Sequence, residues 1–235
     1  MLIIEHLSKI YKGTDKGVKD ISIHVEPGDI YGFIGHNVAG KTTLLKAITG
    51  IHEYDSGRVL IDGIDLKEDP KAVKKRIAYI PDNPDIYDFL TGIQYLNFVA
   101  DIYGVSAAER ERLIAGHAER LEITGALGDL VSSYSHGMKQ KLVLISAFLH
   151  SPRLIIMDEP FVGLDPKAAY VLKEQMREMT AAGGAIFFST HVLDVAEKLC
   201  NKVAIIKDGQ LITSGLMDEV VKEGASLEEL FMETV

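Results

Sequence analysis

Short runs rich in β-branched and aromatic residues alternate with longer stretches of helical period along most of this chain. The alternation is typical of strand–helix–strand units, whose strands lie parallel in one sheet under covering helices. The expected strands are residues 2–5, 18–25, 30–34, 59–61, 77–80, 154–157, 185–189, 203–207 and 210–213. Asp208-Gly209, between the last two, is a strong signal for a type I′ hairpin turn. The pattern therefore predicts an α/β fold with a mostly parallel sheet.

The strand signals stop between Asp85 and His150. Residues 91–103 and 106–122 have a helical pattern instead, and Ser106-Ala107-Ala108-Glu109 predicts a capping box at the start of the second helix. We therefore expect an α/β core built from residues 1–84 and 151–235. An all-helical subdomain, residues 85–150, is inserted into it.

The composition of the chain limits where such a protein can be located and which ligands it can bind. The longest apolar stretch, residues 142–149, is far shorter than the roughly 18 to 20 residues of a membrane-spanning helix. Cys200 is the only cysteine and the N-terminus lacks the zones of a secretory signal, so we expect a reducing, cytoplasmic location. The net charge of −9 argues against broad electrostatic binding to nucleic acid, so any phosphate ligand must be held locally.

A glycine-rich loop supplies such a local site. Residues 35–42, GHNVAGKT, fit the pattern G-x-x-x-x-G-K-[ST] between an expected strand and a helix that begins at Thr43. Glycines let backbone N–H groups turn toward phosphate oxygens, the helix presents its positive end, Lys41 adds a charge and the Thr42 hydroxyl can bind Mg²⁺. A chance turn is the alternative, and the correct flanks favour nucleotide binding. The residues expected around the phosphates are Gly35, His36, Asn37, Val38, Ala39, Gly40, Lys41, Thr42 and Thr43.

Two carboxylates follow the apolar strand 154–157. Ligands of open α/β sheets bind outside the carboxyl ends of the strands, so Asp158 and Glu159 should face the same crevice as the loop. Asp158 is placed to hold Mg²⁺ through water, and Glu159 could polarise an attacking water as general base. An Asp-Glu pair alone would more simply be a solvated loop, but its position after Lys41 favours the catalytic interpretation.

Four further motifs extend the pattern: Tyr134-Ser135-His136-Gly137-Met138, Gly163-Leu164-Asp165, His191 and Tyr11. With the loop and the two carboxylates, they resemble the ATP-binding subunit of ABC transporters over essentially the whole chain. The resemblance implies a P-loop NTPase core with an N-terminal antiparallel β portion. It also implies that the four motifs are the signature, the D-loop, the switch histidine and the aromatic residue that stacks on adenine.

In that family two subunits pack head to tail, and each ATP lies between one phosphate loop and the signature of the other subunit. Ser135, His136 and Gly137 would then contact the partner's ATP, and Asp165 would lie in a loop that reaches across the dimer. Simpler interpretations stay open at each position. Ser135 and Asp165 are also ordinary N-caps for the helices that follow them, and a helix is expected from Lys139. His191 could be a surface residue and Tyr11 a core residue.

Three positions depart from the family pattern. Val38 stands where the phosphate loop usually has glycine, and a β-branched residue is a steric outlier if that position needs positive φ. Asp82 stands in place of the Q-loop glutamine, where a carboxylate could still contact Mg²⁺ but adds negative charge and loses an amide donor. His136 replaces the first glycine of the signature, where it either adds a donor to the γ-phosphate or lies in solvent.

The resemblance implies a cytoplasmic ATPase subunit that uses ATP and Mg²⁺, pairs with a second ATP-binding subunit and drives separate transmembrane permease subunits on the cytoplasmic face of the membrane. The tail 226–231, SLEELF, resembles that of subunits serving exporters, although an amphipathic terminal helix is the simpler explanation. The alternative is a regulatory half of a heterodimer that binds ATP but hydrolyses it poorly. A GTPase would need Asn-Lys-x-Asp, which residues 201–204, NKVA, do not match, and a DNA-repair ATPase would need coiled-coil arms.

Overall fold

The computed structural model describes residues 1–221 and 225–234, and it contains two sheets. The first is antiparallel, with the strand order β2-β1-β4-β5. Its strands are β1 (Leu2–Ile10), β2 (Gly17–Val25), β4 (Ser56–Ile61) and β5 (Ile64–Asp65). The expected strand 2–5 continues to Ile10 because the register of β1 shifts after Ile4, which breaks the simple alternation of buried and exposed residues.

The second sheet has the order β10-β9-β3-β8-β7-β6, and all its pairs are parallel except the β9–β10 hairpin. Its strands are β3 (Ile30–Ile34), β6 (Ile77–Ile80), β7 (Leu154–Asp158), β8 (Ala185–Thr190), β9 (Lys202–Lys207) and β10 (Gln210–Leu216). Every residue of β3, β7 and β8 is buried, as expected for parallel strands covered on both faces. Asp208 and Gly209 have φ of 48° and 78°, so the type I′ turn is confirmed.

Alternate residues of the central strands face two hydrophobic clusters. Phe187 of β8 packs into the cluster shared with the antiparallel sheet, whereas Phe188 packs into the cluster shared with the longer helices. The helices are α1 (Lys41–Ile48), α2 (Pro70–Lys74), α3 (Gly92–Tyr103), α4 (Ala107–Arg120), α5 (His136–Phe148), α6 (Pro166–Ala181), α7 (Leu193–Leu199), α8 (Met217–Val220) and α9 (Leu227–Thr234), with short 3₁₀ turns at Thr124–Ala126 and Val131–Ser133. The α/β class expected from the sequence is confirmed.

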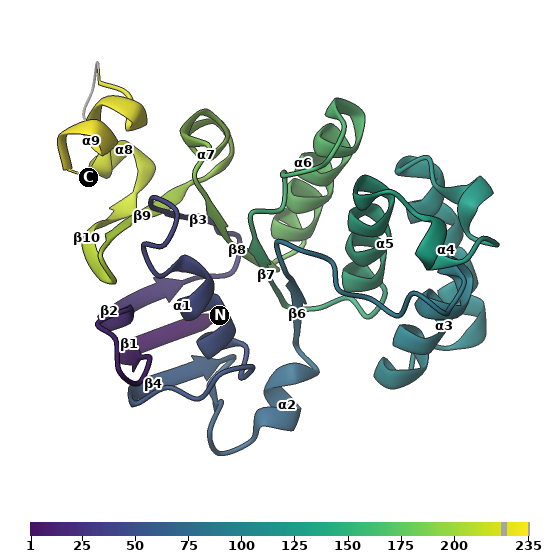
Figure 1. The fold of residues 1–235 in the computed structure, drawn as a ribbon, viewed down its shortest axis with the longest axis horizontal. Helices are drawn as coiled ribbons and strands as arrows, with labels where there is room; N and C mark the ends of the chain where they lie inside the picture. The colour runs from purple at the N-terminus through teal and green to yellow at the C-terminus, as the bar shows by residue number, and fades with distance from the viewer. Residues whose placement is uncertain (222–224, 235) are drawn as a thin grey trace.

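Helices α3, α4 and α5 gather at one end of the molecule, away from the antiparallel sheet at the other end (Figure 1). Ser106 caps α4 by accepting the Glu109 N–H at 3.4 Å, but the Glu109 carboxylate pairs with Arg112. A reciprocal capping box is present at the start of α3, between Thr91 and Gln94. Among residues 1–221 and 225–234, no helix is both long and apolar enough to cross a membrane.

Candidate functional site

The register of the parallel sheet brings three strand ends to one level. Ile34 of β3 pairs with Thr190 of β8, and Ser189 pairs with Asp158 of β7. The loop after β3, the acidic pair after β7 and the residues after β8 therefore meet at one edge. This is the edge at which open α/β sheets bind their ligands.

Backbone crowding fixes the glycines at both ends of the phosphate loop. A Cβ on Gly35 would lie 2.7 Å from both the carbonyl oxygen and Cγ2 of Ile206. Gly40, just before α1, has φ of 106°, and a Cβ there would lie 2.8 Å from the Gly17 oxygen. Since neither position has room for a side chain, glycine is required at both.

Lys41 is the first residue of α1, and its side chain folds back over the phosphate loop. Its buried ammonium donates to the Gly35 oxygen at 2.6 Å and to the His36 oxygen at 3.2 Å. The same nitrogen lies 3.3 Å from Oε1 of Glu159, at ion-pair distance but without hydrogen-bond geometry. The positive charge thus stays at the mouth of the loop.

Val38 has a φ of 74°, in the left-handed region that the sequence analysis identified as unfavourable for a β-branched residue. Its side chain is 81% exposed, so no packing compensates for this backbone conformation. The departure from glycine therefore stores strain in the loop.

Asp158 is almost completely buried at the end of β7. Oδ2 accepts the Thr42 hydroxyl at 2.6 Å, and Oδ1 accepts the Ser189 hydroxyl. Burial raises the pKa of Asp158, with smaller contributions from the negative charges of Asp82 and Glu159, while the two hydroxyl donors oppose the rise. Thr42 and Asp158, both expected to hold a metal, are thus hydrogen-bonded to each other.

Ser189 was not predicted as a site residue. Besides its bond to Asp158, its hydroxyl oxygen accepts the Glu159 N–H at 3.1 Å. In the sequence, Ser189 is a polar residue at the carboxyl end of an apolar strand. That pattern indicates a site residue only when the neighbouring strand is known.

Glu159 connects the loop to the end of β8. Its backbone has φ of 47°, and its carboxylate lies between Lys41 and His191. Oε2 is 2.9 Å from Nδ1 of His191 and also accepts the His191 N–H at 3.3 Å. Glu159 is largely buried and His191 is about half exposed, so the pair faces the solvent side of the site.

Asp82 follows β6, and its side chain is exposed. Its Oδ1 accepts the Asn83 N–H at 2.8 Å, which is a local bond. Its charge nevertheless acts on Asp158, whose pKa it raises. Asp82 therefore makes the surroundings of Asp158 more negative.

Tyr11 is 37% exposed, so it is not a core residue. Its hydroxyl is 3.2 Å from Nδ1 of His52 and accepts the Thr43 hydroxyl at 3.5 Å. Tyr11 lines a cavity of about 250 Å³ together with residues of the loop and α1. The full lining is Tyr11, Lys16, Gly17, His36, Asn37, Val38, Gly40, Lys41, Thr42, Thr43 and Glu159. His52 is a neighbour that the sequence did not indicate.

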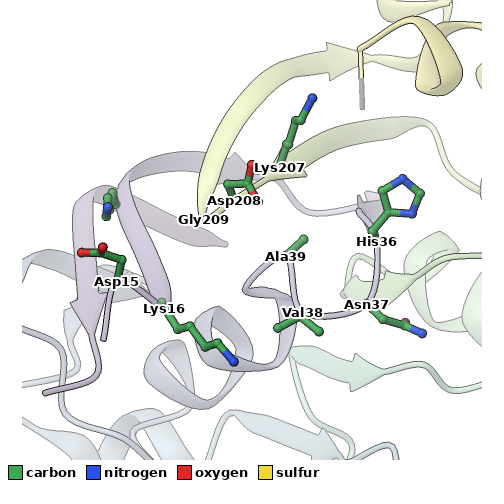
Figure 2. Close-up of a pocket in the computed structure, with 11 residues that line it drawn as sticks. Asp15, Lys16, His36, Asn37, Val38, Ala39, Lys207, Asp208 and Gly209 are labelled. Carbon is green, nitrogen blue, oxygen red and sulfur yellow. The ribbon is translucent and has the colours of Figure 1, made fainter. Parts of the chain in front are cut away.

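A second cavity of about 530 Å³ shares Lys16 and Val38 with the first and extends to Asp208 (Figure 2). The smaller cavity holds Lys41, Thr42 and Glu159, whereas the larger one has none of these three. The three residues that the sequence analysis assigned to phosphate or metal chemistry at these positions therefore share the smaller cavity.

The 134–138 motif lies against the 163–165 motif. Ser135 caps α5 by accepting the Met138 N–H at 3.3 Å, so α5 begins at His136, three residues before the expected start. A Cβ on Gly163 would lie 2.5 Å from Cδ2 of His136, and one on Gly137 would lie 2.9 Å from the Gly163 oxygen. His136 thus packs its exposed ring on Gly163, a contact that neither sequence interpretation had considered.

Asp165 has two partners within the chain. It caps α6 by accepting the Ala168 N–H at 2.8 Å, and Oδ2 pairs with Lys141 of α5 at 2.6 Å. These contacts, led by the bond from Lys141, lower the pKa of Asp165. Among the described residues that line the two cavities, none comes from 134–138 or 163–165.

The sequence matches the family model "ABC transporter" over residues 18–162. It is 34% identical over 220 residues to the ABC-type transporter ATP-binding protein EcsA of Bacillus subtilis (strain 168), which covers 92% of this chain and 89% of that protein. The alignments of this chain with eight curated ATP-binding proteins span 61% to 92% of the length of each relative.

The fold is also similar to solved structures. One, described as the structure of an ATP binding subunit of an ABC transporter, has a TM-score of 0.95 and 36% identity, covering 100% of this chain and 99% of that one. A second is the dimeric, post-hydrolysis cassette MJ0796 bound to ADP and Pi, with a TM-score of 0.84 and 19% identity, covering 92% and 99% of the two chains. With its phosphate loop, acidic pair and signature, the chain belongs to the ABC transporter family, as an ATP-binding subunit with ATPase activity coupled to transport.

Proposed function

We propose that this subunit hydrolyses Mg-ATP with Glu159 as general base and drives export through separate membrane subunits. The supporting observation is the position of the Glu159 carboxylate, between the Lys41 ammonium at 3.3 Å and the His191 ring at 2.9 Å. A carboxylate held at the mouth of a phosphate loop can accept the proton of a water that attacks the terminal phosphate. His191 orients that carboxylate and can donate to the phosphate.

The described residues fit a nucleoside triphosphate. The glycine turn leaves the loop backbone free to bind phosphate oxygens, and Lys41 supplies the positive charge. Tyr11, on the wall of the same cavity, offers an aromatic face for a base.

The residues also fit Mg²⁺. Thr42 and Asp158 present hard oxygen ligands 2.6 Å apart, and Asp82 adds charge nearby. Mg²⁺ would neutralise charge on the phosphate oxygens. Because Asp158 is buried with a raised pKa, a bound cation would also favour its ionised form.

The same proposal assigns Ser135, His136 and Gly137 to the ATP of a second subunit. It is supported by their position outside the two cavities at this chain's own loop, and by the dimeric state of the MJ0796 cassette. Gly163, which contacts this motif, and Asp165, which pairs with Lys141 of the same helix α5, would then couple the signature to the dimer interface. The helical part, residues 85–150, would carry the movement to the membrane subunits. The subunit would therefore work on the cytoplasmic face of the membrane.

Export, rather than import, rests on the resemblance of the tail around Leu227 and Phe231 to that of exporter subunits. The alternative of a hydrolysis-poor regulatory half is motivated by the strained Val38, the charge of Asp82 and the His136 replacement. The complete Lys41–Glu159–His191 arrangement opposes it.

The decisive experiment measures phosphate release by the purified subunit and its Glu159→Gln variant. We expect Glu159→Gln to retain ATP binding, to form a stable dimer with ATP and to lose turnover by about 10²- to 10⁴-fold. Glu111→Gln, on an exposed face of α4, is the matched control. Normal turnover by Glu159→Gln would overturn the role of this residue. Wild-type turnover as low as that of Glu159→Gln would favour the regulatory alternative.

A further inference from the structure

Helix α9 contacts the phosphate loop from the far end of the sequence. The ring of Phe231 meets the ring of His36 edge-on, with centroids 4.9 Å apart and planes at 66°. His36 is the second residue of the loop, and Phe231 lies almost 200 positions later in the sequence. Figure 2 shows the His36 ring on the side of the loop away from Val38 and Lys16.

Local sequence specifies α9. Ser226 accepts the Glu229 N–H at 3.1 Å, and Glu229 accepts the Ser226 N–H at 2.9 Å, which is a reciprocal capping box. The Leu227 N–H also donates to Glu197 of α7 at 3.0 Å. The helix therefore begins at a fixed point and is attached to α7.

Phe231 is anchored in the hydrophobic core. It is 6% exposed and belongs to the hydrophobic cluster that contains Leu199 and Cys200. His36, in contrast, is exposed at the loop surface. The contact thus joins a fixed ring to a side chain of the loop.

The backbone of His36 also stabilises the loop. Its carbonyl oxygen accepts Lys41 Nζ at 3.2 Å and the Ala39 N–H at 3.1 Å. A displacement of His36 would move one of the two carbonyls that hold the Lys41 ammonium. The position of the His36 ring and the position of the Lys41 ammonium are therefore linked.

We propose that Phe231 is a positioning residue of the nucleotide site, which acts through His36 to hold the phosphate loop in its binding conformation. The proposal rests on the proposed function of the loop in ATP binding. It makes α9 a link between the phosphate loop and α7, the helix that begins two residues after His191. Anything that displaces α9 would then lower ATP affinity without removing a catalytic group.

The test measures the dissociation constant for ATP, kcat and the free energy of unfolding in Phe231→Leu and Phe231→Ala. Leucine keeps most of the buried volume, so it should fold even where alanine does not. Because an aromatic pair contributes about 0.5 to 1.5 kcal/mol, we expect Phe231→Leu to weaken ATP binding by about 2- to 12-fold. Turnover at saturating ATP should stay at the wild-type value. Met232→Ala, on the exposed face of α9, is the matched control and should change neither quantity.

A double-mutant cycle with His36→Ala separates this role from a general loss of stability. If Phe231 acts through His36, Phe231→Leu should weaken ATP binding in the wild type and add no further loss in the His36→Ala background. An unchanged dissociation constant in Phe231→Leu, or an equal loss in both backgrounds, would overturn the proposal. These readouts do not depend on Glu159, so a failure of the proposed catalytic role would appear separately, in the Glu159→Gln assay.

Discussion

Left-handed backbone occurs at two non-glycine residues of the nucleotide site, Val38 and Glu159. Among the described residues most other positions of this kind are Asp, His or Ser, which tolerate the conformation better than valine does. Glu159 is held there by bonds from its own N–H and by partners on both sides of its carboxylate. Val38 is exposed and lacks that support, so it is the residue at which strain is most easily removed.

Val38→Gly should raise ATP affinity and stability together. Glycine adopts positive φ without a Cβ clash, and removing about 1 to 2 kcal/mol of strain outweighs the roughly 0.5 to 1 kcal/mol of additional backbone entropy. We expect the free energy of unfolding to rise by about 0.5 to 1 kcal/mol. ATP should bind more tightly because the binding conformation of the loop is more populated. Urea unfolding and an ATP titration measure the two effects.

Val38→Ala is the matched control for this prediction. Alanine removes the branched side chain but keeps the Cβ that is unfavourable at φ of 74°, so it should gain less than glycine. Equal dissociation constants for wild type and Val38→Gly would show that the strain does not affect nucleotide binding.

At the scale of elements, the Asp165 carboxylate joins α5 to α6. Asp165 caps α6 and pairs with Lys141 of α5, while His136 at the start of α5 packs on Gly163 just before α6. Helices α5 and α6 therefore share a junction. A movement of one should be transmitted to the other.

Asparagine and alanine at position 165 separate the two roles of that carboxylate. Asp165→Asn keeps an oxygen for the Ala168 N–H but loses the ion pair with Lys141, so it should reduce the free energy of unfolding by less than about 1 kcal/mol. Asp165→Ala also loses the cap and should reduce it by about 1 to 2 kcal/mol. Urea unfolding at neutral pH gives both values. Equal losses in the two variants would mean that the cap contributes little.

The pH dependence of the same variants has a definite sign. The pKa of Asp165 is lowered in the folded chain, so its stabilisation is present above its ordinary value of 3.8 and is lost as the pH falls through the folded pKa. The stability difference between wild type and Asp165→Asn should therefore shrink only in that acidic range. A difference that stays constant on acidification would exclude the ion pair as its cause.

At the scale of the whole molecule, a cluster of aromatic residues is exposed between β6 and α3 and on α3 itself. Tyr87, Phe89 and Phe98 are 49%, 74% and 42% exposed, and the Tyr87 ring lies 5.6 to 5.7 Å from the other two. Exposed apolar clusters of this kind mark interaction surfaces. Asp88, within the cluster, pairs with Lys139 of the signature helix α5 at 2.6 Å. A partner bound here would therefore be connected to the signature.

We expect the membrane subunit to bind this aromatic cluster. Phe89→Asp should abolish co-purification with the membrane subunit, because a charge would be buried in an apolar contact, while ATP binding by the free subunit stays unchanged. Tyr170→Asp is the matched control, since Tyr170 is also exposed (63%) but lies on α6. Loss of the membrane subunit in both variants, or in neither, would contradict the assignment.

The sequence by itself determined the α/β class, the phosphate loop and nine of the ten strands in the described residues, although it ended β1 at residue 5 and missed β5. It offered helix caps at Ser135 and Asp165 as the simpler interpretations, and both caps are present. These features follow from neighbouring residues: hydrophobic period, glycine at positions without room for a Cβ, and side chains that cap their own helices. The departure of Val38 from the glycine of the family pattern raised the question of a positive φ there, and the structure has φ of 74° at this residue. The position of Glu159 after a buried strand suggested its role as general base, whereas the family resemblance supplied the role of His191.

Only the tertiary structure decided which of these residues meet. The register of β3, β8 and β7 brings Ser189 to Asp158, and it places Glu159 between Lys41 and His191. The contacts of His136 with Gly163 and of His36 with Phe231 likewise join segments that are far apart in the sequence. Such pairs depend on strand order and on how helices pack, which the residues between them do not specify. The phosphate loop was therefore readable from its own residues, whereas the elements that hold it in place were not.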